Sequence, residues 1–126
     1  MQFPENLLYT KDHEWISVDG DVATVGITEF ATSELGDIVY VEIETEGESL
    51  DREEVFGTVE AVKTVSDLYM PVAGKVIAFN EALADDPELV NKDPYGEGWM
   101  IKIRLSEDIA EAELLNAEAY TKQVGA

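Results

Sequence analysis

The sequence contains no cysteine. It therefore has no disulfide framework, no thiolate metal site, no cysteine nucleophile and no thiol redox centre of its own. Any sulfur chemistry must come from a cofactor. Long apolar segments are also missing, since none approaches the roughly 20 apolar residues of a membrane span. The amino terminus shows neither a basic leader nor an apolar run of signal length, so we expect a soluble, cytoplasmic protein without a membrane partner.

Positive charge is scarce in this chain. There are 8 Lys and Arg residues against 28 Asp and Glu, which gives a formal net charge of −20. Such a surface repels phosphate backbones and anionic lipid, and we therefore expect no nucleic-acid partner. We interpret most of this charge as a solvated surface that resists aggregation. The alternative is electrostatic steering toward basic faces of partner proteins.

The length and the pattern of short segments indicate one all-β domain. At 126 residues the chain suits a single domain over 1–126. Short segments rich in Val, Ile, Thr and Tyr alternate with Gly, Asp and Pro, which is typical of a sandwich or barrel. Between the segments 14–18 and 21–27, Asp19-Gly20 predicts a hairpin with positive φ at both central positions.

Two helical segments are predicted beside the strands. Thr28 suits an N-cap and Gly36 a left-handed C-cap, so a short helix is expected near 28–35. In the carboxyl-terminal part, apolar side chains recur at helical intervals at Ile109, Leu114, Leu115 and Tyr120. This pattern predicts a helical segment over about 106–124, interrupted near Asn116.

The sequence offers little for catalysis. It has no phosphate-binding glycine loop and no calcium loop. The single histidine, His13, lies between Asp12 and Glu14. Metal binding usually needs several ligands at fixed spacing, and acid–base catalysis needs a second positioned group. We therefore expect no metal site and no catalytic residue, and we favour a surface or rim position for His13. An enzyme using these three residues would instead turn over without an added partner.

The run DPYGEGWM at 93–100 combines turn residues with two aromatics. It could form the rim of a ligand or partner site. We favour a turn whose aromatic side chains close one end of the sandwich.

Lys63 lies in the stretch VEAVKTVSDLYM, which otherwise has the pattern of two hairpin strands. The presumed tip has no Gly, Asn or Asp, and the β-branched Val62 and Val65 hold the lysine on a stiff frame. A primary amine on a rigid projecting hairpin can be acylated. Acylation removes the charge and makes the stem the base of a long cofactor arm. The pattern therefore favours a non-catalytic carrier of a covalently attached group.

Five segments in order resemble the H protein family of the glycine cleavage system. They are YTKDHEW at 9–15, VGIT at 25–28, LGDIVYVE at 35–42, VEAVKTVSDLYMPVAGKV at 59–76 and ELVNKDPYGEGWMIKI at 88–103. The resemblance covers nearly the whole chain. It implies a barrel-sandwich hybrid of two antiparallel sheets, similar to lipoyl and biotinyl domains, with a lipoyl-binding core over about 22–104.

The resemblance also implies the site residues. Lipoate would be amide-linked to Lys63 at a hairpin turn. Glu60, Asp67 and Gly74 match the positions where the family carries features read by the lipoate-attaching enzyme. His13 and Glu14 match positions near the surface cleft in which the family shelters the loaded arm from water.

The partners implied by the resemblance are three enzymes. A pyridoxal-phosphate glycine decarboxylase (P protein) loads an aminomethyl group onto the oxidised dithiolane. A tetrahydrofolate-dependent aminomethyltransferase (T protein) releases ammonia and passes on the one-carbon unit, and dihydrolipoamide dehydrogenase (L protein) reoxidises the arm. The expected role in glycine catabolism and one-carbon metabolism is that of a shuttle between them.

Two residues depart from the family pattern. Ala61 stands where the family commonly has Ser, and Phe30 stands where it commonly has His.

Two other carrier functions are alternatives to the glycine cleavage role. One is a carrier that relays lipoyl groups to other proteins or serves another lipoate-dependent pathway. Another is a biotin carrier, which is less favoured because Val62 and Thr64 flank the lysine where biotinyl domains usually have Met.

Overall fold

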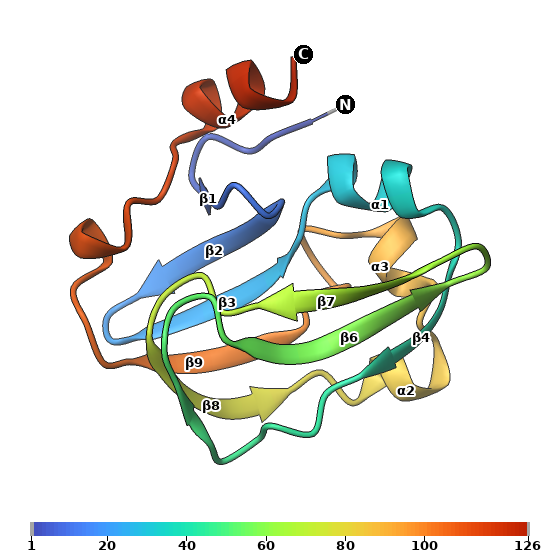
Figure 1. Cartoon of the computed structure of the whole chain (residues 1–126), viewed down its shortest axis with the longest axis horizontal. Coiled ribbons are helices and arrows are strands. Elements are labelled where there is room, and N and C mark those ends of the chain that lie inside the picture. Colours follow the sequence, from blue (N-terminus) through green and yellow to red (C-terminus); the bar gives the residue numbers. More distant parts are fainter. Residues whose placement is uncertain (1, 126) are drawn as a thin grey trace.

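The structure, a computed structural model, describes residues 2–125 (Figure 1). Its strands are β1 Leu8–Tyr9, β2 Glu14–Asp19, β3 Val22–Ile27, β4 Ile38–Glu42, β5 Ser49–Leu50, β6 Val55–Ala61, β7 Val65–Tyr69, β8 Gly74–Phe79 and β9 Ile101–Leu105. Its helices are α1 Glu29–Leu35, α2 Ala82–Asp85, α3 Leu89–Lys92, the 3-10 helix η1 Ile109–Ala112, and α4 Ala117–Val124.

The strands form two antiparallel sheets. One has six strands in the order β1-β2-β3-β9-β8-β5, and the other has three in the order β4-β6-β7. The sheets do not close into a barrel. The predicted fold, two antiparallel sheets with a few short helices, is confirmed.

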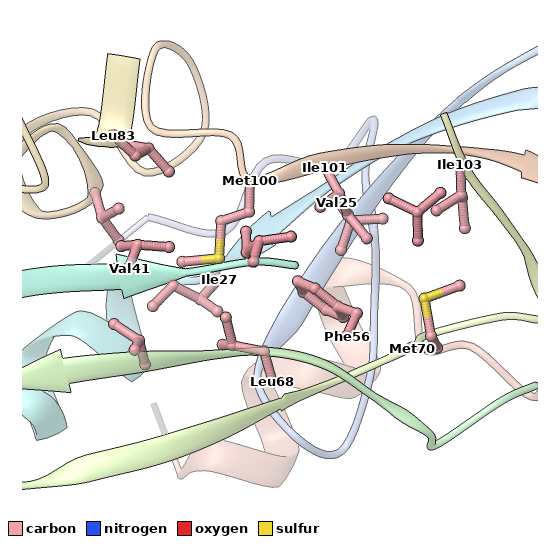
Figure 2. Packing of buried hydrophobic residues seen from close by; sticks show 14 of the residues in the cluster. Val25, Ile27, Val41, Phe56, Leu68, Met70, Leu83, Met100, Ile101 and Ile103 are labelled. Atoms are coloured by element: carbon pink, nitrogen blue, oxygen red, sulfur yellow. The ribbon is translucent and has the colours of Figure 1, made fainter. Parts of the chain in front are cut away.

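The main core lies between the two sheets because apolar side chains alternate along the strands. From the large sheet, Val25, Ile101 and Ile103 point toward the small sheet (Figure 2). Phe56 and Leu68 of β6 and β7 point back at them from the opposite side. The intervening residues of β9 are exposed, so this strand presents charged side chains on the outer face of the large sheet.

The hairpin between β2 and β3 forms as predicted but is centred one residue later. Asp19 pairs with Val22, so Gly20 and Asp21 are the two turn residues. Of these, only Gly20 has positive φ, at 65°. A glycine at the first central position meets the requirement of a type II′ turn, and the expectation of positive φ at both central positions was wrong.

A second apolar cluster covers part of the outer face of the large sheet. Its buried members are Leu7, Tyr9, Trp15, Ala117 and Tyr120, with Tyr95 and Trp99 packed against them. The indole Nε1 of Trp15 donates to the carbonyl of Pro94 at 2.8 Å. Tyr95 and Trp99 of the 93–100 run therefore belong to this second cluster and not to the core between the sheets, so the expectation that they close one end of the sandwich was wrong.

Caps define the two predicted helical segments. Thr28 Oγ1 accepts from the Ala31 amide at 3.2 Å at the start of α1. Gly36 ends the helix with φ 82° and ψ −155°, so it has the expected positive φ but not the left-handed helical conformation. The carboxyl-terminal segment is helical only in η1 and α4. The predicted interruption near Asn116 extends over residues 113–116, and Leu115, expected within the helical pattern, instead pairs with Tyr9 in an isolated β-bridge. The side chain of Asn116 caps α4 by accepting from the Ala119 amide at 2.8 Å. The single-turn helices α2 and α3 were not predicted.

Candidate functional site

Lys63 lies in the two-residue turn of the β6–β7 hairpin. Glu60 pairs with Val65, and the Ala61 amide donates to the Thr64 carbonyl at 2.7 Å, which closes the turn. The amide of Val62 donates to the carbonyl of Asp37 at 3.2 Å and ties the base of the turn to the chain before β4. The turn is thus fixed by backbone bonds rather than by turn-forming residues.

The Lys63 side chain is exposed and forms no ion pair with any described residue. Its stem passes over the end of α1, since Cε lies 3.6 Å from the place where a Cβ on Gly36 would be. In Figure 1 the hairpin tip extends to the side of the molecule where α1 ends. The amine is therefore available for acylation at a place fixed by both the hairpin and the helix.

A cleft of about 420 Å³ adjoins the same end of α1. It is lined by Asp12, His13, Glu14, Ile27, Phe30, Ala31, Glu34, Leu35, Val59, Ser66, Asp67 and Leu68. These residues come from the β1–β2 loop, from the first residue of β2 and the last residue of β3, from α1, and from the hairpin strands β6 and β7. The structure thus brings His13, Glu14 and Asp67 together, and it places this cleft beside the helix end that the Lys63 stem crosses.

Glu14 is a buried carboxyl at the cleft. Its Oε2 accepts from the Tyr69 amide at 2.7 Å, and its Oε1 accepts from the hydroxyl of Thr10 at 3.2 Å. Burial raises the pKa of Glu14 to about 8, against the lowering effect of these hydrogen bonds. The group is therefore neutral in a large fraction of molecules near pH 7 and can ionise when a cation approaches.

His13 is held in a left-handed backbone conformation with φ 68°. Its Nδ1 lies 2.8 Å from the hydroxyl of Tyr120, and its ring packs on Phe30 with 4.7 Å between centroids. Burial lowers the pKa of His13, so the neutral imidazole is favoured. The histidine is half-buried at the rim of the cleft, in agreement with the rim position expected for it.

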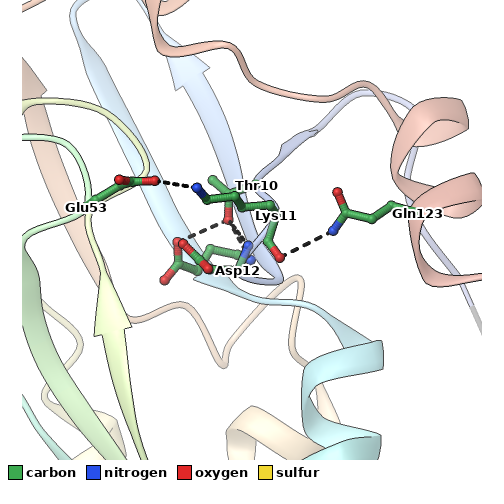
Figure 3. A network of polar contacts seen from close by, with 6 residues as sticks. Thr10, Lys11, Asp12, Glu53 and Gln123 are labelled. Atoms are coloured by element: carbon green, nitrogen blue, oxygen red, sulfur yellow. Dashed lines mark hydrogen bonds and ion pairs between the residues drawn. The ribbon is translucent and has the colours of Figure 1, made fainter.

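A network of polar contacts holds the β1–β2 loop, which carries His13 and leads into Glu14 (Figure 3). Lys11 pairs with Glu53 at 2.9 Å, and the Lys11 carbonyl accepts from the Gln123 side chain at 3.3 Å. The Thr10 hydroxyl accepts from the amide of Asp12 at 3.2 Å. A larger hollow of about 710 Å³ lies next to Lys11 and Glu53 and includes no residue of α1. Lys63 lines neither hollow, but the smaller cleft is lined by Glu34 and Leu35, which directly precede the Gly36 that the Lys63 stem approaches. The smaller cleft is therefore the candidate site.

The three residues matched to lipoylation features occupy different settings. Glu60 is exposed on the outer face of the small sheet, paired across strands with Tyr40 and Val65. Asp67 is exposed and lines the cleft. Gly74 is buried at the start of β8, away from the hairpin tip (Figure 1). A Cβ on Gly74 would lie 2.6 Å from the Arg104 carbonyl oxygen.

Sequence reasoning missed three residues that hold the site. Tyr120 and Thr10 bond to His13 and Glu14, and the Tyr69 amide bonds to Glu14. The helical spacing of Tyr120 indicated a buried position, but no sequence signal identified its partner 107 residues away. Gly36 was expected only as a helix cap, and its contact with the Lys63 stem was likewise not foreseen.

Two antiparallel sheets packed face to face, with an exposed lysine in a tight hairpin turn, define the class of protein to which lipoyl and biotinyl domains belong. Within residues 2–125, no helix is both long enough and apolar enough to cross a membrane.

Comparisons with known proteins identify the family. The family model described as glycine cleavage H-protein matches residues 7–126. A glycine cleavage system H protein of Bacteroides thetaiotaomicron is 59% identical over 120 residues, which cover 95% of each chain. One of Bacteroides fragilis is 58% identical over 126 residues, the full length of both. The crystal structure of a glycine cleavage system H protein from Mycobacterium marinum matches with a TM-score of 0.90 and 40% identity, covering 98% of this chain and 100% of that one. The chain belongs to the glycine cleavage H-protein family.

Proposed function

We propose that the chain is the lipoyl-bearing carrier of the glycine cleavage system and is itself not a catalyst. Lipoate is amide-linked to Nζ of Lys63. The observation that carries this proposal is an exposed lysine, without an ion-pair partner among the described residues, in a backbone-fixed turn beside a cleft. The family membership supports the same function. The whole chain, 1–126, acts as one domain, with its lipoyl-binding core over about 22–104.

The residues around Lys63 fit such a group. Its stem already lies along the end of α1, whose Glu34 and Leu35 line the cleft. An arm extended from Nζ would therefore start close to the cleft mouth. When attached, the dithiolane supplies two sulfurs that accept the aminomethyl group and the electrons of the cycle, a chemistry that this cysteine-free chain cannot supply itself.

In this proposal, the cleft residues shelter the end of the arm. Glu14 offers a carboxyl whose pKa of about 8 would fall if a protonated amine entered, because an opposite charge favours the ionised form. Asp67 adds a carboxylate at the cleft mouth, and the neutral His13 with Phe30 forms part of its wall. Apolar Ile27, Leu35, Val59 and Leu68 limit access of water.

The lipoate-attaching enzyme reads features near the lysine. We assign direct contacts to Glu60 and Asp67, since both carboxylates are exposed on the hairpin. Gly74 acts indirectly, because its missing side chain lets β8 approach the Arg104 backbone closely. The partners of the carrier are then the P, T and L proteins of a glycine-catabolic, one-carbon pathway, and a cytoplasmic location is part of the proposal.

The experiment that tests the attachment is an intact-mass measurement. The chain is produced with lipoate and a lipoate-attaching enzyme, in parallel with Lys63→Arg. Arg retains the charge and is not a comparable acylation acceptor. A lipoyl-sized mass increment in the unmodified sequence and none in the variant supports the proposal, while an increment retained in Lys63→Arg contradicts it.

A further inference from the structure

Three of the eight basic residues of this strongly acidic chain lie together on the outer face of the six-stranded sheet. We name Lys75, Lys102 and Arg104 the basic stripe. Lys75 of β8 is the direct cross-strand partner of Arg104 of β9. Directly opposed residues share one face of a sheet, as do residues two apart on a strand. All three side chains are exposed.

The buried residues on the inner face of β8 and β9 show that the side chains of the stripe point outward. Ile101 and Ile103 are buried in the core between the sheets (Figure 2), and Val76 is buried opposite Ile103. Lys75, Lys102 and Arg104 occupy the alternate positions. The stripe therefore faces away from the three-stranded sheet that carries Lys63.

Most of the other cations of the chain form ion pairs. A carboxylate lies within 3.6 Å of each of Lys11, Arg52, Lys92 and Lys122. Lys63 is the proposed attachment site. In the stripe, Arg104 has only a long contact of 3.9 Å with the exposed Asp21, and Lys102 lies 5.1 Å from the Trp99 ring centroid. Lys75 has no ion-pair partner among the described residues.

This arrangement does not help folding. Like charges directly opposite one another on neighbouring strands destabilise a sheet. In a chain with 28 acidic residues, a carboxylate directly opposite Lys75 would be the ordinary solution. The structure instead places Arg104 there, although Asp21 of the β2–β3 turn reaches Arg104 at 3.9 Å. A local conflict of this kind is characteristic of a functional surface.

We propose that the basic stripe docks a carboxylate-rich surface of a partner enzyme while the Lys63 hairpin stays free. This inference rests on the proposed carrier function. At physiological ionic strength, charges more than about 8 Å away are largely screened. A compact acidic patch is therefore attracted by the three cations of the stripe more than it is repelled by the one nearby carboxylate of Asp21 and by the distant carboxylates. An extended polyanion such as nucleic acid would also meet the acidic remainder, which disfavours it.

Docking through the stripe would separate the surface that binds a partner enzyme from the hairpin and cleft that carry and transfer the aminomethyl group. A partner bound to the outer face of the large sheet covers neither the hairpin of the small sheet nor the cleft beside α1. One enzyme can therefore stay bound to the carrier while the lipoyl arm reaches the active site of that enzyme or of another enzyme.

The test compares two matched double variants of the lipoylated chain. Lys75→Gln with Arg104→Gln removes two charges from the stripe. Lys92→Gln with Lys122→Gln removes two exposed cations of helices, so both variants have the same net charge. Association rates with the purified P, T and L proteins are measured at one physiological ionic strength, together with melting temperature and lipoylation at Lys63.

We expect the stripe variant to associate about tenfold more slowly with at least one of the three enzymes, and the control variant to match the original chain. The melting temperature of the stripe variant should not fall, because the opposed cations are gone. Equal association of both variants with all three enzymes would overturn the proposal. The proposal would also be overturned if the stripe variant bound an RNA oligonucleotide or anionic phospholipid vesicles more weakly than the control variant did, while both variants bound the three enzymes equally. Missing lipoylation at Lys63 would instead contradict the carrier function itself.

Discussion

The hydroxyl of Tyr120 lies 2.8 Å from Nδ1 of His13 and equally 2.8 Å from Oγ1 of Thr28. One buried side chain of the carboxyl-terminal helix thus joins the loop before β2 to the N-cap of α1. Both of these segments line or support the cleft beside Lys63. The terminal helix is therefore part of the framework of the site rather than an appendage to the sheets.

Tyr120→Phe removes both hydrogen bonds but keeps the ring stacked on Tyr9. We expect the free energy of unfolding to fall by about 1–3 kcal/mol, because buried partners lose a hydrogen bond. Chemical denaturation measures this. Tyr40→Phe is the control, since Tyr40 is 49% exposed and its hydroxyl has no hydrogen bond to a described residue. Equal stability of the two variants would contradict this role of Tyr120.

Glu14→Gln tests the buried carboxyl. The raised pKa of about 8 means that the folded state binds more protons than the unfolded state between about pH 4.5 and 8. Stability contributed by Glu14 is therefore present at low pH and is lost as pH rises through this window. Gln retains an acceptor for the Tyr69 amide and does not titrate. Relative to the original chain, Glu14→Gln should gain on the order of a few kcal/mol between pH 5 and 8.

Denaturant titrations of both proteins at several pH values check the Glu14 prediction. The readout is the difference in unfolding free energy between the two proteins. A difference that stays constant across this pH range would show that Glu14 titrates normally in the folded state. Glu44→Gln, at a position outside the cleft, serves as a control for a general change of charge.

Glu60→Ala removes an exposed carboxylate three residues before Lys63. We expect lipoylation to slow by about tenfold, as for loss of one charge-assisted contact, with little change in melting temperature. Glu42→Ala is matched to it, since Glu42 is exposed on the neighbouring strand of the same sheet. Single-turnover lipoylation of both variants decides the point. A large drop in melting temperature with normal lipoylation would contradict direct recognition.

Gly74→Ala should act through stability. The added Cβ would lie 2.6 Å from the Arg104 carbonyl oxygen, so β8 and β9 must move apart. We expect a loss of about 1–3 kcal/mol, as for other overpacked sites. Calorimetry measures it, and lipoylation of the folded protein should keep its rate. A slower rate at unchanged stability would instead mean that the attaching enzyme contacts Gly74.

Much of the β framework could be predicted because period-two patterns decide which side chains face the core. The β4 and β6–β7 segments and the hairpin around Gly20 are of this kind. The turn position slipped by one residue, since Asp-Gly and Gly-Asp both fall within the same short stretch at 19–21. The turn residues alone did not decide the pairing register of β2 and β3. In the observed register, Asp19 belongs to the strand and pairs with Val22.

The single-turn helices and the polar contacts of the site could not be predicted. Helices α2 and α3 are too short to show a helical period, and neither has a side-chain N-cap bond. The contacts of His13 with Tyr120 and of Glu14 with the Tyr69 amide join residues distant in sequence. Such contacts depend on how the sheets and the terminal helix pack, which one sequence does not specify.

The carrier function depends on acylation of one amine, and intact mass with peptide mapping measures it most directly. Protein produced with lipoate and the attaching enzyme should carry one lipoyl-sized increment, located on Lys63. Lys63→Arg should carry none and should keep the circular dichroism of the original chain, while Lys75→Arg, an exposed lysine on the other sheet, should be lipoylated normally. An increment on any other lysine, or none on the original chain under these conditions, would contradict the account.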